Sequence, residues 1–175
     1  MSSPPRRPGL PAEPAEPAEE FRAFVAGAAP RLLHVAELLT GDRAVARAVL
    51  RGALTRTWLS WPALRGGDPY AHARQQLLGG YTRRVPGLWL RARTPRRIRP
   101  RGEPTGLAGS AALAGLSARE RTVAVLRYFE NLDVQATAAA LGMQPEQVER
   151  LAESAVRAML PDRAPAAGPR LGLVG

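Results

Sequence analysis

The chain has 175 residues, no cysteine and a formal net charge of +10, and all 25 of its basic residues are arginine. Without Cys it has no disulfides and no thiolate metal ligands, and without Lys it has neither a P-loop nor a Schiff-base lysine. His34 and His72 are far apart in sequence and lack an acidic companion at ligand spacing, so we expect no metal site. The composition therefore removes the usual anchors of an enzyme, and we predict a protein that is not an enzyme and has no cofactor.

The hydrophobic content of 45% with only 5% aromatic residues implies a core of Leu, Val and Ala, which favours packed helices over a large sheet. We therefore predict an all-α protein. No apolar run approaches the roughly 20 residues that span a bilayer and no signal core follows the start, so we expect a cytoplasmic protein with no membrane among its partners. The positive charge attracts polyanions, chiefly nucleic acid, with anionic membrane surfaces as the alternative, although a GC-rich coding bias would also enrich arginine.

The N-terminal half is predicted to contain a disordered leader and a helical domain. Residues 1–18 alternate Pro with Ala, Glu and Arg, which blocks helix propagation and offers little to bury. Helical periodicity then begins, is kinked or restarted at Pro30, and stops at Gly41, where a left-handed residue can close a helix. A second helix follows the Asp42 cap, and a third follows the next break. We place this helical domain at residues 19–90.

A basic linker is predicted at residues 91–106, where arginines such as Arg96 and Arg97 are interspersed with proline. A solvated tether between two domains has this composition. The alternative is a linker whose arginines also make loose phosphate contacts and hold DNA between the domains, which a salt-dependent component of binding would reveal.

The C-terminal domain is predicted at residues 107–162, followed by a flexible tail at 163–175. Ser117 and Glu120 have the spacing of a capping box, in which hydroxyl and carboxylate satisfy exposed backbone amides at a helix start. We expect the helix that they begin to end at Asn131, because Asn tolerates the left-handed conformation.

The pattern that follows is typical of a helix-turn-helix. Asp133 can cap a short helix, Gly142 ends it, and Pro145 occupies the first position of the next helix. Ala138, Gly142 and Val148 fall where such a unit needs a small side chain at the crossing, a residue free to take positive φ, and an apolar anchor. A purely structural helical hairpin would have similar Gly and Leu positions, so that interpretation stays open at this point.

Two stretches of the chain resemble the sigma-70 family. LSARERTVAVLRYFENLDVQATAAALGMQPEQVERLAESAVRAML, at residues 116–160, resembles region four, especially in LRYFENL followed by AAALG. FRAFVAGAAPRLLHVAELLTGDRAVARAVLRGALTRTWLSWPAL, at residues 21–64, resembles region two of the small two-domain extracytoplasmic-function type. The resemblance implies a dissociable RNA polymerase subunit, whose region two binds the core enzyme and melts the minus-ten element while region four reads the minus-thirty-five element.

The resemblance also implies three groups of contact residues. The start of the last helix would read base edges of the upstream element through Gln144, Glu146, Gln147 and Arg150. The melting region and the linker would contribute Tyr81, Arg83, Arg84, Arg96 and Arg97, with Tyr81 either stacking on a base or filling the core. The polymerase contact would comprise Arg47, Arg51 and Leu54.

Charges at two of these surfaces differ from the family pattern. Arg47 and Arg51 stand at or beside positions where the family places acids that face a basic part of the polymerase, which turns attraction into repulsion. Glu149 and Glu153 would repel phosphates if they face DNA. Two functions therefore stay open. One is a sigma factor with promoter DNA, core RNA polymerase and an anti-sigma factor as partners; the other is a diverged sigma-like protein acting as a DNA-binding regulator or a protein-interaction module without core-polymerase binding.

Overall fold

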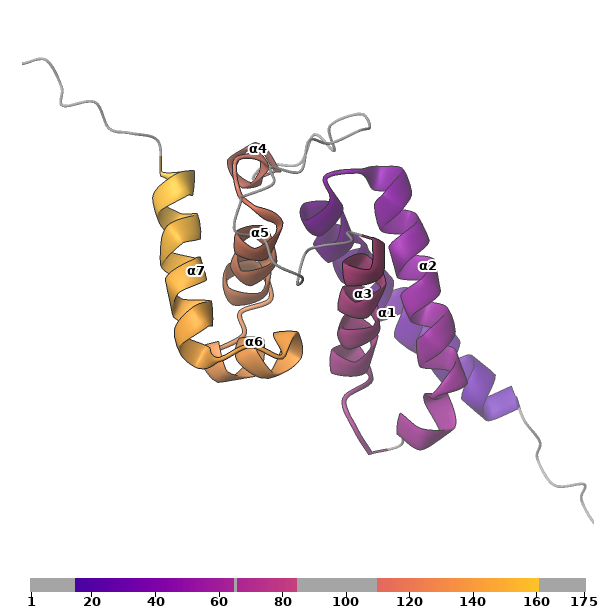
Figure 1. Cartoon of the computed structure of the whole chain (residues 1–175). Coiled ribbons are helices and arrows are strands. Elements are labelled where there is room, and N and C mark those ends of the chain that lie inside the picture. The colour runs from indigo at the N-terminus through magenta and orange to yellow at the C-terminus, as the bar shows by residue number, and fades with distance from the viewer. Residues whose placement is uncertain (1–14, 65, 85–109, 161–175) are drawn as a thin grey trace, which may run out of the picture.

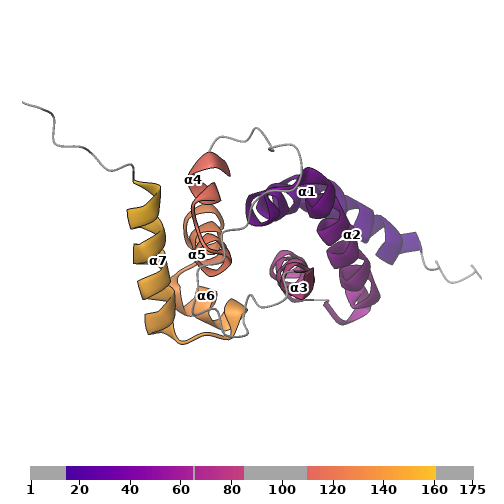
Figure 2. The same ribbon diagram turned by 45° about the horizontal axis from the view of Figure 1, so that its top comes forward.

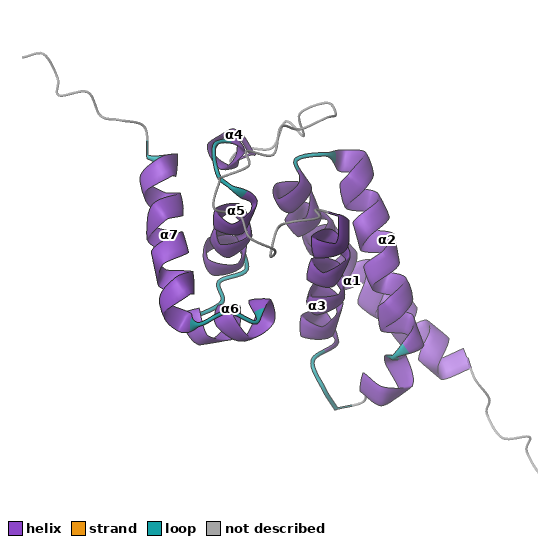
Figure 3. Ribbon diagram, in the orientation of Figure 1, coloured by secondary structure: helices purple, strands orange, loops and turns teal. Residues whose placement is uncertain are grey.

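The computed structural model describes residues 15–64, 66–84 and 110–160, and every regular element in these ranges is helical (Figures 1 and 3). In chain order the elements are α1 (Ala15–Thr40), α2 (Arg43–Leu59), the 3-10 turn η1 (Trp61–Leu64), α3 (Pro69–Arg84), α4 (Ser110–Ala114), α5 (Ala118–Ala124), the π-helical turn η2 (Val125–Phe129), α6 (Val134–Leu141) and α7 (Pro145–Met159). The prediction of an all-α chain is confirmed. The predicted linker at 91–106 and tail at 163–175 lie wholly outside the described residues.

Helices α1, α2 and α3 form an N-terminal body. Helices α1 and α3 face the C-terminal elements, whereas α2 lies on the far side (Figures 1 and 2). The centre of this body consists of aliphatic side chains that are fully buried, namely Leu32, Val35, Leu39, Val49, Ala53 and Leu77. Burying one such Leu or Val stabilises the fold by about 1.5–3 kcal/mol.

Of the two outcomes predicted for Pro30, a kink or a restart, the restart does not occur, because α1 runs continuously from Ala15 to Thr40. Proline in a helix interior removes one backbone hydrogen bond and costs about 3 kcal/mol or more. The ring of Pro30 is exposed, and buried residues precede and follow it at Ala28 and Leu32. The burial of this apolar stripe on both sides of the proline offsets the lost bond. The helix also begins four residues before the predicted domain start at residue 19.

The joint between α1 and α2 has the predicted chemistry. Gly41 has φ of 66° and closes α1. The Asp42 carboxylate then accepts hydrogen bonds from the N–H groups of Ala44 at 2.8 Å and Val45 at 2.9 Å. These two contacts satisfy amides that the first turn of α2 would otherwise leave unpaired.

The C-terminal body begins its main helix with the predicted capping box. The Ser117 N–H donates to the Glu120 carboxylate at 2.8 Å, and the Glu120 N–H donates to the Ser117 hydroxyl at 3.3 Å. The helix does not stay α-helical to its end: Glu130 N–H donates to the Val125 carbonyl, five residues back, which makes η2 a π-helical turn. Asn131 then takes φ of 54° and ends the helix, as predicted.

The two bodies share one buried apolar cluster. Leu116, Val125 and Leu126 of the C-terminal body belong to the same cluster as the core of α1, α2 and α3. The rings of His34 in α1 and Phe129 in η2 lie 4.5 Å apart. The described parts of the chain contain no helix long and apolar enough to cross a bilayer.

Candidate nucleic-acid interface

Helices α6 and α7 meet across a tight turn that depends on Gly142. Gly142 has φ of 60°, a left-handed conformation that L side chains rarely adopt. Ala138 is buried at the helix crossing, and Val148 is fully buried as the anchor of α7. Together with Val123 and Ala152 these side chains form a small core between α5, α6 and α7. The scaffold predicted for a helix-turn-helix is therefore present.

The starts of α6 and α7 are capped by their own side chains. The Asp133 carboxylate accepts a hydrogen bond from the Ala136 N–H at 2.6 Å. At the start of α7 the Gln144 N–H donates to the Gln147 side-chain oxygen at 3.2 Å, and Pro145 is the first helical residue. The Gln147 side-chain oxygen is therefore engaged within the protein, whereas its NH₂ group takes no part in this contact.

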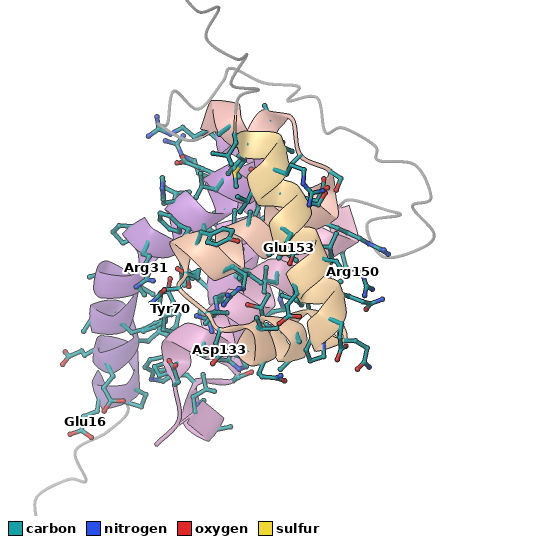
Figure 4. All side chains as sticks on the ribbon, turned by 90° about the vertical axis from the view of Figure 1, so that its left-hand side faces the viewer. Glu16, Arg31, Tyr70, Asp133, Arg150 and Glu153 are labelled. Carbon is teal, nitrogen blue, oxygen red and sulfur yellow. The ribbon has the colours of Figure 1, made fainter. Side chains whose placement is uncertain are left out.

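The outward face of α7 is open to solvent, as a major-groove reading helix requires. All four predicted reading residues are exposed; they are Gln144, Glu146, Gln147 and Arg150. Glu149 and Glu153 are exposed on the same helix. Figure 4 views α7 from its open side, with Arg150 and Glu153 on it. The helix thus presents Arg150 between acidic side chains and Arg157 in its last turn, and phosphate attraction from α7 itself is weak because its three acids outnumber its two arginines.

Ser154 is partly buried and connects α7 to α5. Its hydroxyl donates to the Glu120 carboxylate at 2.6 Å, so that Glu120 serves both the capping box and the packing of α7. Burial alone would raise the pKa of the Glu120 carboxyl, but hydrogen bonds from Ser154 and Ser117 outweigh it and hold the pKa below its ordinary value. The sequence suggested the capping box but not this second contact, because it joins residues 34 positions apart.

The residues predicted for the melting region differ in their exposure to solvent. Tyr81 is buried, with 1% of its surface exposed, whereas Arg83 and Arg84 are exposed in the last turn of α3. Burial raises the pKa of the Tyr81 phenol to about 12, against the opposing positive charge of Arg121 in α5. In this conformation Tyr81 is a core residue and presents no ring to an unstacked base. Arg96 and Arg97 lie outside the described residues.

Arg56 joins the basic group at the end of α3, and sequence reasoning missed it. Its guanidinium donates to the Gln76 side chain and to the Gln76 carbonyl, each at 3.0 Å, which holds it against α3. Burial lowers the pKa of Arg56, and the positive charges of Arg83 and Arg84 lower it further. The described residues supply no carboxylate that pairs with these three guanidinium groups. The repulsion between them favours an anionic ligand.

The surface predicted to contact polymerase is exposed on α2. Arg47 and Arg51 are one helical turn apart and solvent-exposed, and Leu54 beside them is half-buried. Helix α2 contains no acidic residue between Arg43 and Leu59. This face is therefore purely basic within the described structure.

A buried carboxylate between the two bodies was not predicted. Glu130 accepts hydrogen bonds from Arg31 Nε at 2.9 Å, Tyr70 OH at 3.0 Å and Arg74 Nη1 at 3.1 Å. Its side chain is fully buried. The Arg31 and Arg74 guanidinium groups lie 5.3 Å and 5.8 Å from the centre of the Tyr70 ring, and Figure 4 shows Arg31 beside Tyr70. No local pattern signals this cluster, because the three donors lie 56 to 99 positions from Glu130 in sequence.

The Glu130 carboxylate shifts the pKa values of two groups that it contacts, Arg31 and Tyr70. The negative charge of Glu130 raises the pKa of Arg31, so this guanidinium stays charged. Burial, followed by the charge of Glu130, raises the pKa of Tyr70 well above its ordinary value, so the phenol stays protonated and continues to donate. The described residues contain no group of His, Asp and Glu side chains that could hold a metal ion.

Comparison with known proteins assigns the C-terminal body to a family. Residues 112–159 match the family model described as Sigma-70, region 4. No curated protein matches the chain. The matched residues run from α4 to the end of α7 and so include the capping box, the Gly142 turn and the exposed face of α7. Residues 112–159 are thus a sigma-70 region 4 domain, a non-enzymatic DNA-binding helix-turn-helix of the type that sigma factors use at the minus-thirty-five element.

Proposed function

We propose that the chain is a sigma factor of the small two-domain extracytoplasmic-function type that directs RNA polymerase to promoters in the cytoplasm. The observation that carries this proposal is the open outer face of α7 in a domain that matches region 4. Gln144 and Arg150 lie in the N-terminal half of α7, the part of a recognition helix that reaches base edges. Gln pairs best with adenine and Arg with guanine.

The N-terminal body supplies the second DNA contact in this proposal. The basic group of Arg56, Arg83 and Arg84 at the ends of α2 and α3 would hold phosphates near the minus-ten element, and Arg96 and Arg97 would continue that contact into the linker. An N-terminal body that resembles region two supports this arrangement by its position and its charge. Tyr81 would reach a base only if the body that covers it moved away.

Selection of binding sequences from a random duplex pool tests whether α7 reads DNA. We expect Arg150→Ala to relax the preference at one position, at a cost of about 1–3 kcal/mol, since a bidentate Arg–guanine contact supplies that much discrimination. Arg157→Ala, which removes an exposed Arg from the last turn of α7, is the matched control and should leave the preference unchanged. Equal sequence preference in wild type and Arg150→Ala would contradict the role of α7.

Reconstitution with the cognate core polymerase tests the sigma function itself. The expected result is a holoenzyme that initiates at a promoter selected as above, at low salt. Failure to bind core polymerase or to initiate, in a protein that still binds DNA, would reject the sigma function while leaving the region 4 domain intact.

The exposed arginines of α2 favour a second function. Arg47 and Arg51 would repel a basic polymerase surface, so a sigma-like regulator or protein-interaction module without core-polymerase binding is the alternative; an anti-sigma factor or another acidic partner would suit this face. A double variant with Arg47→Glu and Ala48→Glu separates the two functions. If that variant binds core polymerase more tightly than the wild type, the arginines prevent binding, whereas a wild type that binds equally well supports the sigma factor.

A further inference from the structure

We propose that the chain forms a two-fold symmetric dimer, in which the acidic start of α1 in each copy lies on the outer face of α2 in the other copy. The inference concerns the N-terminal body alone and does not rest on the proposed sigma function. Two surfaces of opposite charge carry it, because neither has an ion-pair partner within the described residues and an aromatic group lies between them.

One stripe of side chains on the solvent side of α2 is basic at one end and apolar at the other. This α2 stripe consists of Arg47, Arg51, Leu54 and Trp58. Their spacing places them along one side of the helix, as in the seam of a coiled coil. The two arginines are exposed and make no ion pair within the described residues, and 40% of the Trp58 surface is exposed.

The first turns of α1, residues 15–20, form an acidic arm. Helix α1 has 26 residues and α2 has 17, so at about 1.5 Å per residue α1 is about 13 Å longer. Figures 1 and 2 show its start projecting past α2 on the side away from the C-terminal body, and Figure 4 shows Glu16 at its free end. The charged residues of the arm are all acidic, exposed and without an ion pair in the described part of the chain; they are Glu16, Glu19 and Glu20.

An aromatic group joins the acidic arm to the α2 stripe. The ring centre of Phe21, the first residue after the arm, lies 5.0 Å from that of Trp58 in the stripe and 5.0 Å from that of Trp61 in η1. The Phe24 ring, one turn further along α1, lies 5.2 Å from Trp61. These contacts hold the arm beside the apolar end of the stripe. The surface therefore changes from acidic through aromatic to basic.

A surface with this order of charges is complementary to itself when it is rotated by 180°. A two-fold axis near Leu54 brings the acidic arm of one copy to Arg47 and Arg51 of the other, and symmetry repeats the same pairing. Trp58 of each copy then lies near the arginines of the other copy, where an aromatic face attracts a guanidinium. The dimer therefore covers the residues predicted to contact polymerase, and any partner of that face must compete with the second copy.

Other occupants fit only one end of this surface. Nucleic acid, an anionic membrane and a uniformly acidic protein are attracted by the arginines but repelled by the arm, whereas a basic protein surface is repelled by the arginines. A second copy presents the opposite charge at both ends. The net charge of +10 opposes association. At about 0.15 M salt, however, repulsion between exposed charges more than about 8 Å apart is largely screened, and the short contacts remain.

Charge reversal tests the pairing, and sedimentation equilibrium of the full chain at about 0.15 M salt measures it. The wild type should show a concentration-dependent equilibrium between monomer and dimer. The arm variant carries Glu16→Arg and Glu19→Arg. The stripe variant carries Arg47→Glu and Arg51→Glu. Each should raise the dissociation constant of the dimer at least about 10-fold, because attraction at both symmetric contacts becomes repulsion.

Two combinations of these substitutions should restore the dimer. An equimolar mixture of the arm variant and the stripe variant places opposite charges at both contacts. A single chain with all four substitutions does the same and keeps the net charge of the wild type, so its dimer should also return. Circular dichroism should show the wild-type helix content in every variant, which separates loss of the dimer from loss of the fold.

Matched controls change the net charge by the same amounts on α7. Glu149→Arg with Glu153→Arg matches the arm variant, and Arg150→Glu with Arg157→Glu matches the stripe variant; both should dimerise as the wild type does. A wild type that is monomeric at about 100 μM would overturn the dimer. Equal loss in the controls, a dimer that survives both reversals, or no recovery in the mixture and the combined chain would overturn the pairing. Because no measurement uses DNA or polymerase, each of these failures leaves the proposed function untouched.

Discussion

The Ser154 hydroxyl in the middle of α7 donates to the Glu120 carboxylate in the first turn of α5 at 2.6 Å. The same carboxylate accepts from the Ser117 N–H at 2.8 Å. One side chain thus completes the start of α5 and fixes how α7 packs on it. Because α7 is the candidate reading helix, the geometry of the DNA-binding surface depends on a residue that would not itself touch DNA.

Glu120→Gln should therefore weaken both the cap and the attachment of α7. We expect a loss of about 1–3 kcal/mol in the free energy of unfolding, because a charge-assisted hydrogen bond becomes a neutral one and partners are left less satisfied. Glu19→Gln, at an exposed site of α1, is the control and should change stability little. Urea unfolding monitored by circular dichroism measures the free energy of unfolding of the two variants.

The depressed pKa of Glu120 also predicts a pH dependence. A carboxyl whose pKa is lower in the folded protein contributes stability that is present above its unfolded pKa of about 4.3. That contribution is lost as the pH falls through the lower folded pKa. Between neutral pH and about pH 3 the wild type should therefore lose more stability than Glu120→Gln. If the free energy of unfolding depends on pH in the same way in the two proteins, Glu120 is not stabilised in its charged form.

Tyr81→Phe should be tolerated, and it should remove an alkaline transition. The Tyr81 hydroxyl is buried without a normal hydrogen bond, so its removal should change stability by less than about 1 kcal/mol or stabilise the protein. The pKa of Tyr81 is raised to about 12, so wild-type stability should fall as the pH rises from 10 toward 12, because the unfolded phenol ionises first. The variant should lack that part of the decline. A loss of several kcal/mol at neutral pH would mean that the hydroxyl is bonded.

Gly142→Ala should destabilise the helix-turn-helix through backbone conformation alone. A Cβ at this position would have open space around it, but φ of 60° costs an L residue about 1–2 kcal/mol. Gly115→Ala is a matched control, since its Cβ also meets nothing and its φ is not in the left-handed region. Thermal unfolding should show a loss for the first variant and no comparable loss for the second.

Neutralising the acids of α7 should strengthen DNA binding. Glu149→Gln and Glu153→Gln each remove an exposed negative charge from the candidate reading helix. If α7 lies against DNA, affinity should rise in both, and by more at low salt, because repulsion from nearby phosphates is screened over about 10 Å at 0.1 M. Glu20→Gln on α1 is the distant control. Unchanged affinity in the α7 variants would place that helix away from DNA.

Much of the local structure could be predicted from the sequence because its signals are local. The Asp42 and Asp133 caps, the capping box at Ser117 and the left-handed Asn131 and Gly142 each depend on chemistry within a few residues of the chain. Such contacts are satisfied in nearly the same way wherever the helix is placed. The helix-turn-helix was predictable for the same reason.

Where the sequence left alternatives open, packing decided between them. Pro30 has a strong tendency to end a helix, but buried residues on both sides keep α1 intact. The aromatic ring of Tyr81 could have stacked on a base or filled the core, and packing buries it against α5. In both cases the deciding energy comes from side chains distant in sequence, and a sequence pattern does not report it.

The sequence by itself determined the helices, their caps and the turn that makes a region 4 domain, because these depend on neighbours along the chain. Only the tertiary structure decided that Glu130 is buried among Arg31, Tyr70 and Arg74. It also brought Arg56 beside Arg83 and Arg84, and Ser154 to Glu120. A charge acquires such a partner only when the fold removes both from water and sets them at hydrogen-bonding distance, and that distance is a property of packing.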